Sequence, residues 1–307
     1  MTIVPAVDDP QGLGPGPACA SAPPLLHRAG PVTLPGLGTA LVHEGERRVG
    51  APTVILLHGL GATAALNWYT SFPALAARYH VVAPDLRGHG RGIRARIPFT
   101  LEDAADDVAA LADSLEIERF VPVGYSMGGP IAQLLWRRHR DRVAGLVLCA
   151  TASTFRATPR EHVMFAALPA LGQMNRIVPD AFSRRLIAQI SRSYLAATGF
   201  RDWAQSELLR RDPRAVLQAA IELGKYSGKD WVGEIDVPTS VVIHARDQIV
   251  PARRQLALAS SVPGATTHVV DADHFAVIRE RERFVDTLVR AVDQVVLHPG
   301  TASRHAA

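Results

Sequence analysis

A serine at position 126 stands in a sequence context that could make it a nucleophile. Ser126 lies in the run 124–128 (GYSMG), after an apolar stretch at 120–123 and before a helical pattern at 131–136. A sharp turn from strand to helix strains the backbone of such a serine, and the residues two before and two after it must be small because they approach closely. The G-x-S-x-G pattern in this context therefore favours a nucleophilic serine over one that caps an ordinary helix.

A serine hydroxyl is a weak nucleophile, so a base must take its proton and an acid must orient that base. His274 follows a strand pattern at 267–270, and Asp247 follows a strand pattern that ends at His244. Both lie at carboxyl ends of strands, where an open parallel sheet gathers its functional groups. Serine, aspartate and histidine also occur in the order expected of hydrolases with this serine turn. We therefore predict the catalytic set Ser126, Asp247 and His274.

Other carboxylates fit the acid position less well. Asp271 and Asp273 are sequence neighbours of His274, and a side chain next door seldom reaches the ring nitrogen. Asp236 precedes its strand pattern and would lie at the wrong edge of the sheet. The strand pattern that ends at Cys149 is not followed by an acid.

Hydrolysis also needs hydrogen-bond donors for the oxyanion that forms on the substrate carbonyl. The backbone amide of Met127, directly after the serine at a helix N-terminus, is one candidate. The other candidate is the amide of Leu60, in the loop 58–61 (HGLG) that follows the strand pattern 54–57.

The same early loop also matches a different function. Residues 59–64 (GLGATA) fit the dinucleotide-binding pattern G-x-G-x-x-A, and Asp85 follows at the spacing of a ribose-binding acid. Against a dinucleotide site, the polar His58 precedes the first glycine, and another strand pattern comes before this one. A dinucleotide site would also leave the set around Ser126 unexplained, so we favour the hydrolase.

The elements that position these residues alternate between strand and helix patterns, which is typical of a mainly parallel sheet covered on both faces. Strands are predicted at 39–43, 53–57, 80–83, 120–123, 143–149, 240–244 and 267–270. Helices are predicted at 101–115, capped by Thr100, at 127–139 and at 282–296. We therefore predict an α/β fold with a mostly parallel, doubly wound sheet.

The alternation stops between about 151 and 233, where only helix patterns occur. These patterns cover about 162–167, 181–194, 200–210 and 214–225. We predict that residues 152–232 form a helical lid, inserted between two late strands of a core made of 31–151 and 233–297. Residues 1–30 are predicted to be a disordered Pro/Gly-rich tail, and residues 298–307 a C-terminal tail.

Four aromatic residues are candidates for the substrate pocket. Trp68 follows the early loop, and Tyr125 precedes the serine. Phe165 and Trp203 belong to the predicted lid. A helical lid needs an apolar core of its own, and the aromatic residues not used there would line an apolar acyl site.

Composition excludes several other classes. The net charge of +4 comes from arginines scattered among acids, and aromatic residues make up only 6% of the chain, so nucleic-acid binding is not expected. The densest basic cluster is Arg87, Arg91, Arg94 and Arg96. This cluster is either a solvated loop or an anion site for a phosphate-bearing substrate. The 12 histidines of the chain show no paired metal-ligand spacing, so we expect neither metal nor cofactor.

The sequence also indicates a location in the cell. No stretch reaches the roughly 18 uncharged apolar residues of a membrane span, so an integral membrane protein is not expected. Residues 1–24 lack the basic and apolar regions of a secretory signal. Cys19 and Cys149 are not expected to form a disulfide. We therefore predict a cytoplasmic protein.

The chain resembles the α/β-hydrolase superfamily, in its esterase, enol-lactonase and cofactor-free haloperoxidase branch, over about residues 30–297. The motifs that carry this resemblance occur in the family's order: His58-Gly59-Leu60, 85–90 (DLRGHG), 124–129 (GYSMGG), the Asp247 segment and 273–275 (DHF).

The resemblance implies that the turn at 85–90 is structural, with Asp85, Arg87 and His89 bracing the floor of the active site. One departure is His244, because a glycine often stands three residues before the acid in this family.

The predicted function is hydrolysis of a small or medium apolar carboxylic ester or lactone, through an acyl-enzyme on Ser126. Carbon–carbon bond hydrolysis, acyl transfer and perhydrolysis use the same residues and stay open, as does a small-molecule sensor that signals through a partner. Dehalogenase and epoxide hydrolase activities are disfavoured, because those enzymes carry aspartate at the serine position. A homodimer is also left open.

Overall fold

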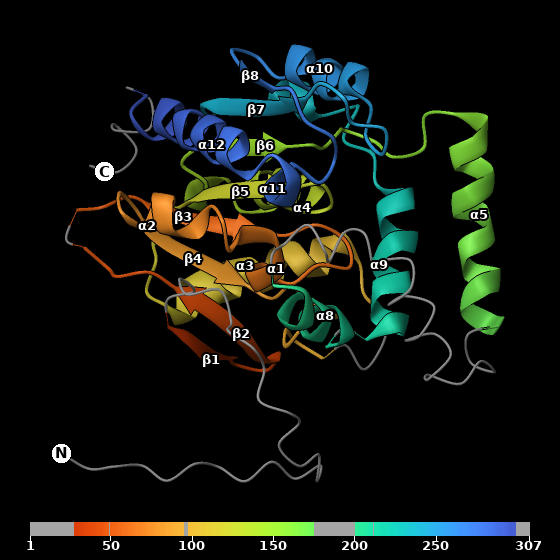
Figure 1. Ribbon diagram of the computed structural model, residues 1–307, viewed down its shortest axis with the longest axis horizontal. Helices are drawn as coiled ribbons and strands as arrows, with labels where there is room; N and C mark the ends of the chain where they lie inside the picture. The colour runs from red at the N-terminus through yellow and green to blue at the C-terminus, as the bar shows by residue number, and fades with distance from the viewer. Residues whose placement is uncertain (1–27, 49, 95–97, 175–199, 211, 299–307) are drawn as a thin grey trace, which may run out of the picture.

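The computed structural model describes residues 28–48, 50–94, 98–174, 200–210 and 212–298. They form an eight-stranded sheet in the order β1-β2-β4-β3-β5-β6-β7-β8, with helices on both faces (Figure 1). The strands are β1 (Ala29–Leu34), β2 (Gly38–Glu44), β3 (Thr53–Leu57), β4 (His80–Pro84), β5 (Val121–Tyr125), β6 (Leu146–Cys149), β7 (Thr239–His244) and β8 (Thr266–Val270). Strand β2 pairs antiparallel with β1 and β4, and all other pairs are parallel. The predicted fold class is confirmed.

Two hydrophobic cores lie on opposite faces of the sheet. One core includes α3 (Leu101–Ser114), α4 (Gly128–Arg138), α9 (Pro213–Lys225) and α10 (Ala252–Ser261). The other includes α1 (Ala64–Trp68), α2 (Phe72–Ala76), α8 (Arg201–Leu209), α11 (Ala276–Arg279) and α12 (Arg281–Val296). Every residue of β3 to β7 is buried, because these central strands are covered on both sides. This burial explains the short apolar run in each of these strands.

Helix α3 begins where its sequence predicts. The Thr100 side chain accepts from the Asp103 amide at 3.1 Å, and the Asp103 carboxylate accepts from the Thr100 amide at 2.7 Å. This reciprocal cap satisfies amides that the first turn leaves without partners.

Several elements differ from their predicted bounds. Strand β1 was not predicted, and it begins at Ala29, two residues inside the segment assigned to the N-terminal tail. Strand β6 begins at Leu146 rather than at 143, because Val143 makes only an isolated bridge to Phe120. Residues 1–27 and the helix predicted at 181–194 lie outside the described residues.

The segment between β6 and β7 contains α5 (Pro159–Met174), α8 and α9 (Figure 1). Helix α9 lies between α5 and the sheet, and the Phe165 ring of α5 packs against Gly224 of α9, where a Cβ atom would collide with it. The Arg254 guanidinium of α10 lies 2.5 Å from the Glu161 carboxylate and so joins the start of α5 to the core. That this segment forms a lid stays a prediction. Among the described residues, no helix has the length and apolar character needed to span a membrane.

Candidate active site

The turn from β5 to α4 holds Ser126 in the left-handed region, with φ of +52°. A Cβ at Gly124 would collide with the carbonyl oxygen of Gly128, and a Cβ at Gly128 would collide with that of Leu57. The Ser126 amide donates to the Cys149 carbonyl at 2.9 Å, which ties the turn to β6. The small residues predicted around the serine are therefore required by close backbone approach.

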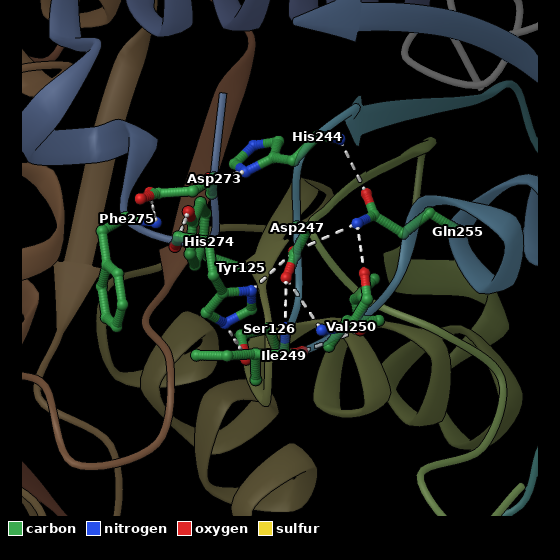
Figure 2. A network of polar contacts seen from close by, with 11 residues as sticks. Tyr125, Ser126, His244, Asp247, Ile249, Val250, Gln255, Asp273, His274 and Phe275 are labelled. Atoms are coloured by element: carbon green, nitrogen blue, oxygen red, sulfur yellow. Dashed lines mark hydrogen bonds and ion pairs between the residues drawn. The ribbon is translucent and has the colours of Figure 1, made fainter. Parts of the chain in front are cut away.

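The three residues predicted as the catalytic set form a chain of contacts, in which His274 lies between Ser126 and Asp247 (Figure 2). His274 Nε2 lies 3.0 Å from Ser126 Oγ, and His274 Nδ1 lies 2.7 Å from Asp247 Oδ2. Because a carboxylate can only accept, Nδ1 carries a proton and Nε2 is free to accept from the serine hydroxyl. All three side chains are buried. This arrangement can activate a serine for attack on a carbonyl carbon.

The Asp247 carboxylate is surrounded by donors. Oδ1 accepts from the Ile249 and Val250 amides, each at 2.8 Å. Oδ2 accepts from Gln255 Nε2 at 3.1 Å, in addition to His274 Nδ1. These bonds supply the interactions that a buried carboxylate loses with water.

The rival carboxylates have other partners. Asp273 accepts from the Phe275 amide at 2.7 Å and pairs with Arg279 at 2.5 Å. Asp271 pairs with Arg246 at 2.8 Å, and Asp236 accepts from the indole of Trp136 at 2.9 Å.

The early loop lies against the serine. A Cβ on Gly59 would lie 3.4 Å from Ser126 Cβ, and the Gly59 amide donates to Asn67 Oδ1 at 3.1 Å. Among the described residues, the amides of Leu60 and Met127 have no hydrogen-bond acceptor. Met127 is the N-cap of α4, so its amide lies at the positive end of that helix. The two amides predicted to bind the oxyanion are thus on the segments that flank Ser126.

Most of the chain matches one protein family. The family model described as alpha/beta hydrolase fold matches residues 52–280. A pimeloyl-[acyl-carrier protein] methyl ester esterase of Neisseria meningitidis serogroup C is 32% identical over 238 residues, which are 75% of this chain and 90% of that protein. The chain belongs to the α/β-hydrolase family of enzymes.

Other members of the α/β-hydrolase family are similar over most of their length. A 2-hydroxymuconate semialdehyde hydrolase of Pseudomonas sp. strain CF600 is 29% identical over 266 residues, or 83% of this chain and 93% of that protein. The structure of an enol-lactonase from Burkholderia xenovorans LB400 has a TM-score of 0.66 and 25% identity, and the match covers 86% of this chain and 99% of that one.

The turn at 85–90 has the packing expected of a structural element. Asp85 accepts from the Ala64 amide and from the Arg91 amide, each at 2.8 Å, so it joins this turn to the start of α1. Burial raises the pKa of the Asp85 carboxyl. These bonds occupy the acid that the dinucleotide alternative needs for a ribose.

Arg87, the first arginine of the basic cluster, is already paired with a carboxylate and is not available to bind an anion. Arg87 Nε donates to Asp107 at 2.7 Å, and the partly buried guanidinium forms a second bond to the same carboxylate. Arg96 lies outside the described residues. Among the described residues, His, Cys, Asp and Glu side chains form no group of three or more that could hold a metal ion.

His58 is a structural residue of the early loop. It is completely buried, its Nε2 accepts from the Leu86 amide at 3.0 Å, and its Nδ1 donates to the Gly59 carbonyl at 2.9 Å. Burial lowers the pKa of His58 to about 4. The ring is therefore neutral when the protein is folded. Its single N–H donates one hydrogen bond, and its other nitrogen accepts one.

The low pKa of His58 predicts acid sensitivity of the fold. Between pH 6.5 and about 4 the unfolded state binds a proton that the folded state does not, so stability falls as pH falls through this range. We expect His58→Gln to lower the free energy of unfolding at pH 7 but to reduce its loss between pH 7 and 4.5 by on the order of 2 kcal/mol. Urea denaturation at both pH values measures this loss. An equal loss in both proteins would contradict the prediction.

Two residues that support the site, Thr151 and Gln255, were not predicted from the sequence, and a third, His244, was noted only as a departure from the family pattern. Thr151 Oγ1 donates to the Ser126 carbonyl at 2.8 Å, Gln255 binds Asp247, and His244 Nδ1 donates to the Asp273 carbonyl at 2.9 Å. His244 carried a signal, since it stands where the family often has glycine. Thr151 and Gln255 carried none, because spacing along the chain does not show which buried groups will meet.

The four aromatic candidates for the substrate pocket all take part in packing. Trp68 is completely buried and meets Tyr125 edge to face, and the Tyr125 hydroxyl donates to the His274 carbonyl at 2.7 Å. The Trp203 ring packs on the ring of Tyr69, the C-cap residue of α1. Phe165 packs on α9, as described above. Their role in substrate binding stays a prediction.

Proposed function

We propose that this enzyme hydrolyses a small or medium apolar carboxylic ester or lactone through an acyl-enzyme on Ser126. The observation that carries the proposal is the chain of hydrogen bonds from Ser126 through His274 to Asp247. The strained serine turn and the two unoccupied amides beside it, both among the described residues, add support.

In the proposed mechanism, Ser126 Oγ attacks the substrate carbonyl while His274 Nε2 takes its proton. Asp247 stabilises the imidazolium that forms, and the Leu60 and Met127 amides bind the oxyanion. His274 then protonates the leaving alcohol. A water molecule, deprotonated by the same ring, releases the acid and restores the serine.

The apolar character of the proposed substrate is supported by two side chains close to the site. Leu60, in the early loop, is 36% exposed. Ile249, two residues after Asp247, is 55% exposed. Two similar proteins are named as a methyl ester esterase and an enol-lactonase, which supports an ester or lactone substrate.

Carbon–carbon bond hydrolysis is a second candidate. The similarity to a 2-hydroxymuconate semialdehyde hydrolase over 83% of the chain favours it. Both candidates use the same serine, so the substrate decides between them.

Fluorophosphonate labelling followed by a substrate panel tests the proposal. We expect one covalent adduct, located on Ser126 by peptide mass spectrometry, and turnover of p-nitrophenyl esters or lactones that peaks at one acyl length. The control is Ser126→Ala, which should neither label nor turn over. Faster turnover of a vinylogous diketone would favour the second candidate. Without labelling or turnover, ligand-dependent thermal stabilisation would favour a small-molecule sensor.

A further inference from the structure

A buried glutamine holds the carboxylate of Asp247 in place. Gln255 lies in the first turn of α10, and its side chain is completely buried. Its Nε2 donates to Asp247 Oδ2 at 3.1 Å and to the Val250 carbonyl at 2.6 Å. Its Oε1 accepts from the His244 amide at 3.0 Å (Figure 2). The side chain thus joins the end of β7 to the loop that carries the acid.

These three contacts allow only one orientation of the Gln255 amide. In the flipped orientation, its oxygen would face the Asp247 carboxylate and the Val250 carbonyl, and its NH₂ group would face the His244 N–H. Acceptors would then oppose acceptors and donors would oppose donors in a buried place, at a large cost in free energy. The donor therefore always points at the carboxylate.

We propose that Gln255 is a positioning residue, which holds Asp247 in the rotation that accepts from His274 Nδ1. This inference rests on the proposed function, because it concerns how the acid orients the base. Asp247 Oδ2 accepts hydrogen bonds from both Gln255 Nε2 and His274 Nδ1. Asp247 Oδ1 accepts from two main-chain amides. Without the amide of Gln255, one of the four donors is lost and Oδ2 is held by the imidazole alone.

A neutral donor suits this place. An arginine or lysine would neutralise the Asp247 charge and weaken its attraction for the imidazolium form of His274. The amide of Gln255 orients the same oxygen and leaves the net charge at −1. It thereby separates the orientation of the acid from its electrostatic effect on the base.

His244 connects Gln255 to the residue that precedes His274. Gln255 Oε1 binds the backbone amide of His244, and the His244 ring donates to the carbonyl of Asp273, directly before His274. The His244 ring is completely buried and packs on Tyr125 and Phe284. Burial lowers the pKa of His244 to about 4, so the ring stays neutral. One buried network therefore contacts both the acid and the backbone of the base.

The test compares Gln255→Leu with a matched loss of a buried glutamine elsewhere. Gln133 is also completely buried, its Oε1 accepts from the Tyr226 hydroxyl at 3.0 Å, and its Nε2 donates to the Ala152 carbonyl at 3.4 Å. The measured quantity is the second-order rate constant of fluorophosphonate labelling of the full chain between pH 5 and 9. This rate needs no knowledge of the natural substrate.

We expect Gln255→Leu to label about ten- to a hundredfold more slowly, since it loses a hydrogen bond to a charged group, and Gln133→Leu to label at the wild-type rate. Without this donor the Asp247 carboxylate can turn away from His274 Nδ1 and then stabilises the imidazolium less. The acidic limb of the pH profile should therefore move to lower pH. Equal slowing in both variants, or an unmoved limb in Gln255→Leu, would overturn the proposal.

Gln255→Glu keeps the test decisive if the leucine variant does not fold. In this variant a protonated carboxyl group can donate to Asp247 and accept from the His244 amide, whereas its ionised form would repel Asp247. We expect labelling near the wild-type rate at low pH and a new alkaline limb as the introduced carboxyl ionises. A profile without that limb would contradict a donor role. Failure of the proposed function itself is distinguished by wild-type protein that does not label at all.

Discussion

Ser126→Ala is expected to lower kcat/KM for a p-nitrophenyl ester by about 10⁴-fold or more, because the proposed acyl-enzyme can no longer form. The residual rate would come from substrate binding and from the proposed oxyanion donors on the flanking segments. Steady-state kinetics with active-site titration of the wild type measure the loss. Turnover within tenfold of the wild type would show that another residue is the nucleophile.

Ser126→Gly provides a control that separates catalysis from folding. Alanine keeps the Cβ atom that makes a φ of +52° unfavourable, and glycine removes it. Both variants should be inactive, but the glycine variant should melt about 2 °C above the alanine variant. Equal melting temperatures in calorimetry would mean that the serine backbone is not strained in solution.

Asp247→Asn is expected to lower kcat by about 10⁴-fold. The oxygen of the new amide can still accept from the Ile249 and Val250 amides, but its NH₂ group would face His274 Nδ1 and Gln255 Nε2, which are both donors. The imidazole would turn or adopt the other tautomer, so Nε2 would no longer accept the serine proton. Steady-state kinetics should show little change in KM, because in the proposed mechanism the substrate does not contact the acid.

Asp273→Asn is the matched control for the acid. Asp273 is next to His274 in sequence but is paired with Arg279 and with the Phe275 amide, and the side-chain oxygen of asparagine can keep the second contact. We expect kcat within about threefold of the wild type, since loss of a partly exposed ion pair is a small effect. A large loss in Asp273→Asn together with an active Asp247→Asn would reverse the assignment of the acid.

Local sequence patterns predicted much of the fold because the corresponding interactions are local or repeat along one element. The central strands β3 to β7 are buried on both faces, so each shows a short apolar run. Helix α3 has its cap within four residues, from Thr100 to Asp103. Strand β1 was missed, because an edge strand with Gly30 and Pro31 has no continuous apolar run. Helices α1, α2 and α11 have four or five residues, too few to show a period.

The candidate nucleophile could be proposed from the sequence for a similar reason. Ser126 and the glycines that its turn requires lie within five residues, and the order of Ser126, Asp247 and His274 follows the order of the strands. The sequence could therefore indicate three residues at one edge of the sheet. Its pattern also suggested the amides of Leu60 and Met127 as candidate oxyanion donors.

The surroundings of these residues could not be predicted, because they form only when distant segments pack together. The bonds from Gln255 to Asp247, from Thr151 to Ser126 and from His244 to the loop of His274 join groups that meet only when the sheet is assembled. A buried side chain chooses its partner by distance and direction in space, and spacing along the chain carries neither. The residue types and their order along the chain therefore indicated the candidate chemistry, and folding brought together the buried groups that hold the candidate residues in position.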